Sequence, residues 1–267
     1  MAVEQENTNA GEMSFWDHLE VLRGTVFRSA LVIMLMSVIV FCFKKFVFDD
    51  IVFAPTKSDF FLYDWLGMDM NMSLVNLEVS TQFFVHLKVA FEFGFILALP
   101  FVCWEIWKFI APALYEKEKK TIRKVFFVAA FLFYLGLAIG FLLIVPISLN
   151  FFMGYKVSEA VVNTISLNSY ISLFTSTTLA FGLVFEFPAV IAILSGLGLV
   201  TKDTLRKYRR HAIVVILIIA AIITPADPFS MVLAAAPLLI LYEVSILACR
   251  KSMREDEDTE STEVVAK

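Results

Sequence analysis

Long apolar runs constrain this chain more than any other feature, because each needs lipid around it. Six runs alternate with polar gaps in the 267 residues, at 24–43, 83–106, 125–149, 171–197, 212–224 and 229–248. A spanning helix needs about 20 mostly apolar residues. The hydrophobic share of 59% and the 28 phenylalanines also exceed what a water-soluble core requires. The pattern predicts an all-α polytopic membrane protein with six transmembrane helices, of which the last two are short.

Basic residues indicate which gaps face the cytoplasm. Lys and Arg crowd the gaps 107–124 and 198–210, whereas 150–170 holds only Lys156. Under the positive-inside rule, the two basic gaps and both termini are cytoplasmic, and 44–80 and 150–170 lie outside. Three lysines in the first outer gap oppose this assignment but are outnumbered: Lys44, Lys45 and Lys57.

The chain divides into three parts. Residues 1–23 form a cytoplasmic N-terminus with an amphipathic segment, 24–249 the six-span domain, and 250–267 an acidic tail predicted to be disordered. In the amphipathic segment Phe15, Leu19 and Leu22 share one stripe, so we expect it to lie along the membrane surface.

The longest gap, 44–80, is too short for an independent core. Its aromatic residues predict a cap on the outer membrane interface, where Trp and Tyr are favoured: Phe60, Phe61, Tyr63 and Trp65.

Several functional classes lack support. The cysteines and histidines lie in separate segments without metal-ligand spacing: Cys42, Cys103, Cys249, His18, His86 and His211. No nucleophile and base have a suitable spacing, and no gap is large enough for a head domain. We therefore expect no enzyme, no cofactor, no metal and no nucleic-acid partner.

The last two runs form a short hairpin around Pro225 and Asp227. About 14 residues precede the turn and rise about 21 Å, less than a hydrocarbon core of roughly 30 Å. The turn then lies below the membrane surface, or the bilayer thins there. A plain hairpin in a thinned bilayer is at least as good an interpretation as a functional cavity.

Ionisable residues inside the runs need an explanation, because an acid at the bilayer centre costs on the order of 3 kcal/mol. Lys88 and Glu92 are spaced i,i+4, and mutual pairing is favoured over a proton relay. Glu186 shares a helix face with Thr175 and Gly182. This stripe predicts close approach by another helix and a protein or cavity contact for the acid.

Five motifs in order resemble the TatC family, the multi-span receptor of twin-arginine protein translocation. They are His18-Leu19-x-x-Leu22-Arg23, Ala54-Pro55, Phe109-Ile110-Ala111-Pro112-Ala113-Leu114-Tyr115-x-x-Glu118, Phe181-Gly182-x-x-Phe185-Glu186-x-Pro188 and Thr224-Pro225-x-Asp227. The resemblance covers the chain from Ser14 to about Arg250.

The resemblance implies a receptor for signal peptides with paired arginines, in the bacterial inner (cytoplasmic) membrane. It implies single-span partners of the TatA and TatB type, an oligomeric complex, and energy from the proton gradient. Four residues would bind the signal peptide: Glu118, Glu20, Arg23 and Phe109. Intramembrane polar residues would dock the partners: Glu186, Thr224 and Asp227. Four prolines would be structural: Pro55, Pro112, Pro188 and Pro225.

Two positions depart from the family pattern. The family usually has a glutamate where this chain has Val21, and Glu20 lies one residue earlier, about 100° away on a helix. Either Glu20 reaches the same ligand differently, or Glu118 carries more of the recognition. Met231 stands where the family commonly has glutamine, which predicts a thinner polar cluster around Glu186.

The alternative function is a proton-coupled transporter. Its relay would consist of Lys88, Glu92, Glu186 and Asp227.

Overall fold

Helices make up nearly all of the computed structural model, which describes residues 15–67, 72–113, 116–158, 163–196, 198–224 and 228–249. The α-helices are α1 (Phe15–Cys42), α2 (Phe61–Leu66), α3 (Thr81–Ile110), α4 (Glu116–Ile139), α5 (Val145–Gly154), α6 (Leu167–Phe185), α7 (Phe187–Gly196), α8 (Lys202–Lys207), α9 (Arg209–Ile223) and α10 (Pro228–Ala248). Shorter helices are the π-helices η1 (Phe46–Val52) and η4 (Gly140–Ile144) and the 3-10 helices η2 (Ala54–Thr56) and η3 (Ala111–Ala113). Strands β1 (Leu74–Val75) and β2 (Ile165–Ser166) pair in parallel.

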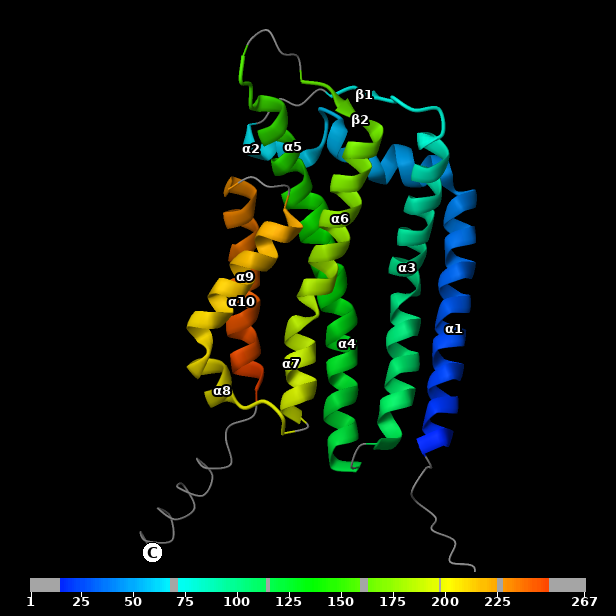
Figure 1. Ribbon diagram of the computed structural model, residues 1–267, viewed down its shortest axis with the longest axis vertical. Helices are drawn as coiled ribbons and strands as arrows, with labels where there is room; N and C mark the ends of the chain where they lie inside the picture. The colour runs from blue at the N-terminus through cyan, green and yellow to red at the C-terminus, as the bar shows by residue number, and fades with distance from the viewer. Residues whose placement is uncertain are drawn as a thin grey trace, which may run out of the picture.

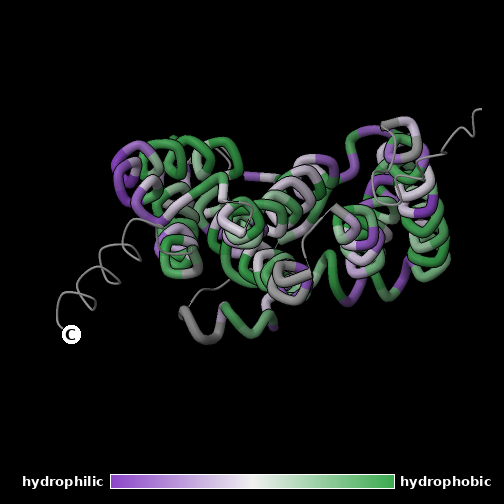
Figure 2. Tube along the Cα trace, turned by 90° about the horizontal axis from the view of Figure 1, so that it is seen from below, coloured by the Kyte–Doolittle hydropathy of each residue, from purple (hydrophilic) through white to green (hydrophobic). Residues whose placement is uncertain are grey.

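The long helices form an elongated bundle, with α1 beside α3 at one side and α8, α9 and α10 at the other (Figure 1). Seen end-on, much of the helical trace is hydrophobic (Figure 2), and many of its large apolar side chains are exposed. Five helices in the described part of the chain are long and apolar enough to cross a membrane. The sixth, α9, has 15 residues and rises about 22 Å. The predicted all-α, six-helix membrane fold is confirmed. Of the last two helices only α9 is short, because α10 has 21 residues and is one of the five candidate spans.

Two spans are interrupted, one by a π-helix and one by a break between two α-helices. The third continues from α4 through η4 into α5, so that residues Arg123–Gly154 form one run. The fourth changes from α6 to α7 at Glu186, just before Pro188, which lacks the backbone donor that a continuous helix would need.

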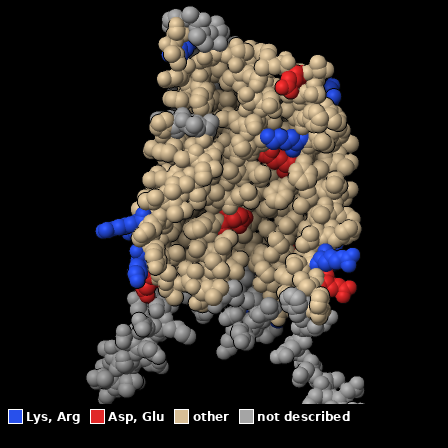
Figure 3. All heavy atoms as spheres, in the orientation of Figure 1, with Lys and Arg blue, Asp and Glu red and all other residues tan. Residues whose placement is uncertain are grey.

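The two ends of the bundle differ in charge and structure. At one end lie the start of α1, the α3–α4 connection and α8, which carry most of the basic residues; we call it the basic end (Figure 1). At the other end η1, η2, α2 and the two strands form a cap (Figure 1). Figure 3 shows a long face between them on which charged side chains are few. The two gaps predicted to share a side therefore do share one.

Tyrosines hold the cap together. The buried hydroxyl of Tyr63 donates to the Pro55 carbonyl over 2.5 Å, and that of Tyr170 donates to the Val52 carbonyl. Burial raises the pKa of Tyr63, so its hydroxyl stays protonated and remains a donor. The aromatic gap thus closes the bundle end, as expected of residues 44–80.

The first helix differs from the expectation of a separate surface segment. α1 runs unbroken from Phe15 to Cys42, so the amphipathic stretch is its first turns. Leu19 and Leu22 are exposed along this extension, and Trp16 is exposed near its start. Helical propensity continues across Gly24 without a proline or turn signal, which explains why no break forms.

Candidate functional site

The start of α1 and the end of α3 meet at the basic end of the bundle. The His18 ring stacks on the Phe109 ring, with 4.4 Å between ring centroids and 28° between ring planes. Phe109 is the penultimate residue of α3, directly before the turn η3 that contains the exposed Pro112. The first and third sequence motifs therefore lie in contact, although 91 positions separate these rings in the numbering, from 18 to 109.

Next to this stack, α1 presents polar and apolar side chains to the surroundings. Glu20, Val21 and Arg23 are all exposed, so the carboxylate and the guanidinium are available to a ligand. Glu118 lies in the first turn of α4, but its side chain is outside the described part of the structure. The structure therefore brings the α1 residues close to Phe109 and leaves the position of the Glu118 carboxylate open.

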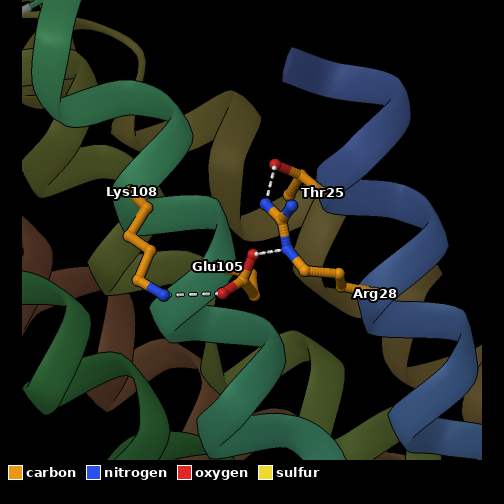
Figure 4. Close-up of polar contacts among 4 residues, drawn as sticks. All are labelled: Thr25, Arg28, Glu105 and Lys108. Carbon is orange, nitrogen blue, oxygen red and sulfur yellow. Dashed lines mark hydrogen bonds and ion pairs between the residues drawn. The ribbon is translucent and has the colours of Figure 1, made fainter. Parts of the chain in front are cut away.

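An ion cluster not predicted from the sequence joins α1 to α3 (Figure 4). Arg28 donates through Nε to Glu105 Oε2 over 2.7 Å, and Lys108 donates through Nζ to Glu105 Oε1 over 2.8 Å. The Glu105 side chain is only 2% exposed, whereas those of Arg28 and Lys108 are 54% and 53% exposed. Arg28 Nη2 also reaches Thr25 Oγ1, at 3.5 Å.

This cluster makes a buried acid tolerable. Each carboxylate oxygen has its own cation, so the cost of removing Glu105 from water is offset on both sides. Lys108 additionally lies 5.8 Å from the centroid of the Trp104 ring. Arg28 and Lys108 are positively charged and Glu105 is negatively charged, so the cluster carries a net charge of +1 next to the His18–Phe109 stack.

Sequence reasoning placed Glu105 within the run 83–106 without asking what neutralises it. Two signals were present: Lys108 follows at i+3, and Arg28 lies inside the first apolar run. Both charges are unusual in lipid-spanning segments, so a pairing between the first two helices could have been proposed. The contact itself depends on how α1 packs on α3.

Glu186 occupies the junction of α6 and α7. Its Oε1 atom is buried and lacks a hydrogen-bond partner. The same holds for Thr178 Oγ1 in α6. The backbone N–H of Glu186 donates to the Leu183 carbonyl over 3.2 Å. An intramembrane acid with an unused acceptor can take a hydrogen bond from another chain.

The close helix approach predicted at Gly182 is confirmed. A Cβ on Gly182 would lie 3.0 Å from atoms of Phe133 and of Leu137, both on α4. The close approach that this glycine allows is therefore made by a helix of the same chain. Thr175, on the same face, is buried as well.

The other predicted docking residues give a mixed result. Thr224 is buried at the end of α9, and its hydroxyl donates to the Ala220 carbonyl over 2.9 Å. Pro225 and Asp227 lie outside the described residues. Pro188 is buried in α7. Met231 is partly buried against an apolar cluster that includes Phe185.

The predicted pairing of Lys88 with Glu92 does not form a direct ion pair. Glu92 is buried and its Oε1 atom has no hydrogen-bond partner, although Lys88 lies one turn away. Lys88 instead lines an apolar groove of about 670 Å³ between α1 and α3, with Phe41 and Phe91. The positive charge of Lys88 still acts on the Glu92 carboxyl group, although no hydrogen bond joins the two side chains.

The sequence of this chain is similar to those of known proteins from one family. The family described as "Sec-independent protein translocase protein (TatC)" matches residues 17–237. TatC from Blattabacterium sp. subsp. Periplaneta americana is 34% identical over 250 residues, covering 88% of this chain and 94% of that protein. TatC from Desulforapulum autotrophicum is 35% identical over 255 residues, covering 94% and 91% respectively.

Solved structures agree with the sequence relatives. A crystal structure of the twin arginine translocase receptor TatC has a TM-score of 0.70 and 32% identity, covering 86% of this chain and 97% of that chain. A second, in the detergent DDM, has a TM-score of 0.73 at 32% identity, covering 87% and 99%. The relatives are components of a protein translocase, which favours protein translocation over the alternative of small-solute transport. The chain belongs to the TatC family of Sec-independent protein translocases.

Proposed function

We propose that this protein binds twin-arginine signal peptides at its basic end and that this end faces the cytoplasm of a bacterial inner membrane. The observation that carries the proposal is the contact between α1 and α3 at His18 and Phe109, beside the exposed Glu20. The solved relatives are twin arginine translocase receptors, which agrees with this role for their family. Arg23 and Phe109 would line the site, and Glu118 would supply a second carboxylate.

The chemistry of recognition follows from the side chains. A carboxylate accepts a guanidinium through two parallel hydrogen bonds, whereas an ammonium group acts as a point charge. A site at the membrane interface is partly desolvated, which strengthens such a pair relative to water. Because the surrounding surface is basic, exposed carboxylates are the selective element for an arginine pair.

Peptide affinity tests this proposal. Glu118→Gln keeps the shape of the side chain and removes its charge, so it should weaken binding of a twin-arginine peptide by about 10- to 100-fold. Asp203→Asn is the matched control, since Asp203 is an exposed acid of α8. The binding constant is measured on the reconstituted protein, with a twin-lysine peptide in parallel.

Two further variants test which carboxylate binds the peptide arginines. Val21→Glu should preserve or tighten binding, because it adds an acid on the exposed side of α1. If Glu118→Gln binds the twin-arginine peptide as tightly as the unchanged protein and Glu20→Gln binds it more weakly, the recognising carboxylate lies on α1. Equal affinity for the twin-lysine peptide would overturn the proposed specificity.

We also propose that Glu186 docks a TatA- or TatB-type single-span partner, with Thr224 and Asp227 as further docking residues. The support is the buried, unpartnered Oε1 atom at the α6–α7 junction. A partner helix with a polar donor would satisfy this acceptor and relieve its burial cost. The resulting complex contains several subunits.

Copurification tests the docking proposal. Glu186→Ala should lower recovery of the single-span partner and abolish export, while peptide binding remains. Glu92→Ala is the matched control, because Glu92 too has a buried oxygen atom without a hydrogen-bond partner. Normal partner stoichiometry and normal export in the Glu186→Ala variant would contradict the docking proposal and would show that Glu186 has only a structural role.

A further inference from the structure

We propose that Glu105 is an additional arginine-binding carboxylate of the peptide site, and that Arg28 is an internal competitor for it. This inference rests on the proposed function at the basic end. In the unliganded protein, the guanidinium of Arg28 occupies one oxygen of Glu105. An incoming peptide arginine would take its place.

Glu105 lies within reach of a ligand held by the His18–Phe109 stack. Glu105 and Phe109 are spaced i,i+4 on α3, so they share one face of that helix. Glu105 precedes the last residue of α3, Ile110, by about 7.5 Å of helix rise. A long arginine side chain can span that depth while its backbone remains at the membrane surface.

The present occupancy of Glu105 is suited to exchange. Each carboxylate oxygen is held by a different cation, with Arg28 on Oε2 and Lys108 on Oε1 (Figure 4). Neither cation uses the two-pronged contact that a guanidinium makes with a carboxylate. A ligand arginine could replace both single contacts by one bidentate pair.

The exposure of the three side chains also favours exchange. Arg28 and Lys108 are half-exposed, so they can turn towards water or anionic headgroups when displaced. Glu105 itself is buried, which makes any pair that it forms stronger than one at the surface. Twin lysines could displace the cluster only as point charges, which adds discrimination against them.

Opposite effects of the two partners of one ion pair provide the test. Arg28→Gln removes the competitor and should tighten binding of a twin-arginine peptide by about 3- to 10-fold, since Lys108 alone then holds the acid. Glu105→Gln removes the acceptor and should weaken binding by about tenfold or more. The double variant should bind no better than Glu105→Gln alone.

A purely structural clamp predicts a different pattern. If the pair only fixes α1 against α3, Arg28→Gln and Glu105→Gln both loosen the site and change affinity in the same direction. Arg28→Lys, which keeps the charge but loses the planar fork, guards against misfolding and should bind the peptide at least as tightly as the unchanged protein. Thermal unfolding of each purified variant separates lost stability from lost recognition.

The outcomes separate the two proposals. If the unchanged protein binds the twin-arginine peptide but both single variants weaken it equally, the exchange is overturned while peptide recognition stands. If the unchanged protein does not distinguish twin-arginine from twin-lysine peptides, the proposed function fails and this inference fails with it. Tighter binding by Arg28→Gln together with weaker binding by Glu105→Gln supports the exchange.

Discussion

Buried carboxylates of two kinds lie within the helices of this protein. Glu105 has a cation at each oxygen, whereas Glu92 and Glu186 each keep a buried oxygen without a hydrogen-bond partner. The first is satisfied within the chain and couples two helices. The other two carboxyl groups each keep an oxygen atom that could accept a hydrogen bond from a partner molecule. Without such a partner, the buried oxygen lowers the stability of the protein.

Replacing Glu92 tests this distinction at the residue scale. Glu92→Leu removes a buried carboxyl group whose Oε1 atom has no hydrogen-bond partner. The purified protein should therefore unfold at the same or a higher temperature. Glu105→Leu should lower the unfolding temperature, because it removes the ion pair that joins α1 to α3. A large loss of stability in Glu92→Leu would show that its carboxyl group has a structural partner.

Glycines allow several helices to approach closely. A Cβ on Gly94 of α3 would lie 2.2 Å from Ser37 Oγ and 2.5 Å from the Ser37 backbone nitrogen on α1. Gly94→Ala should therefore destabilise the protein by about 1–3 kcal/mol through overpacking. Gly154→Ala is the control, since nothing lies within 4 Å of its Cβ position. Similar unfolding temperatures for the two variants would contradict this packing.

At the scale of the elements, sequence patterning predicted the helices better than their contacts. Runs of about 20 apolar residues were sufficient to place the spans, and the short run before Pro225 correctly indicated a short α9. Which helix packs on Gly182, and that Lys88 lines a groove, could not be predicted, because these features depend on α4 and α1, which lie far away in sequence. The Arg28–Glu105 pair was missed for the same reason.

The outer cap gives an element-scale prediction. Tyr63→Phe removes the donor that the Pro55 carbonyl accepts, so a buried acceptor loses its partner. The expected cost is about 1–3 kcal/mol. Thermal unfolding and protease sensitivity of residues 44–80 would report it. Tyr155→Phe is a suitable control because Tyr155 is exposed; equal loss in both variants would argue against the cap contact.

At the scale of the whole molecule, the basic end and the cap define opposite sides of the membrane. The positive-inside rule predicts that the basic end is cytoplasmic. Sequence alone could group the gaps correctly because charge marks them, whereas the contact of His18 with Phe109 required the folded bundle. The similarity to the solved TatC structures supports the same fold.

Cysteine labelling in intact cells tests this orientation. In a variant without native cysteines, a membrane-impermeant reagent should reach a cysteine at position 156 from outside. It should not reach one at position 202 until the membrane is opened, because Lys202 lies at the start of α8 at the basic end. The reverse pattern would invert the proposed topology.

The most direct measurement of peptide recognition is photocrosslinking from defined positions. A photoreactive side chain at position 20 or 109 should crosslink a twin-arginine signal peptide, and a twin-lysine peptide should crosslink much less. The same group at exposed Leu77, near the cap, should give no crosslink. Crosslinking of both peptides alike, or capture from position 77 in place of positions 20 and 109, would contradict a twin-arginine site at the basic end.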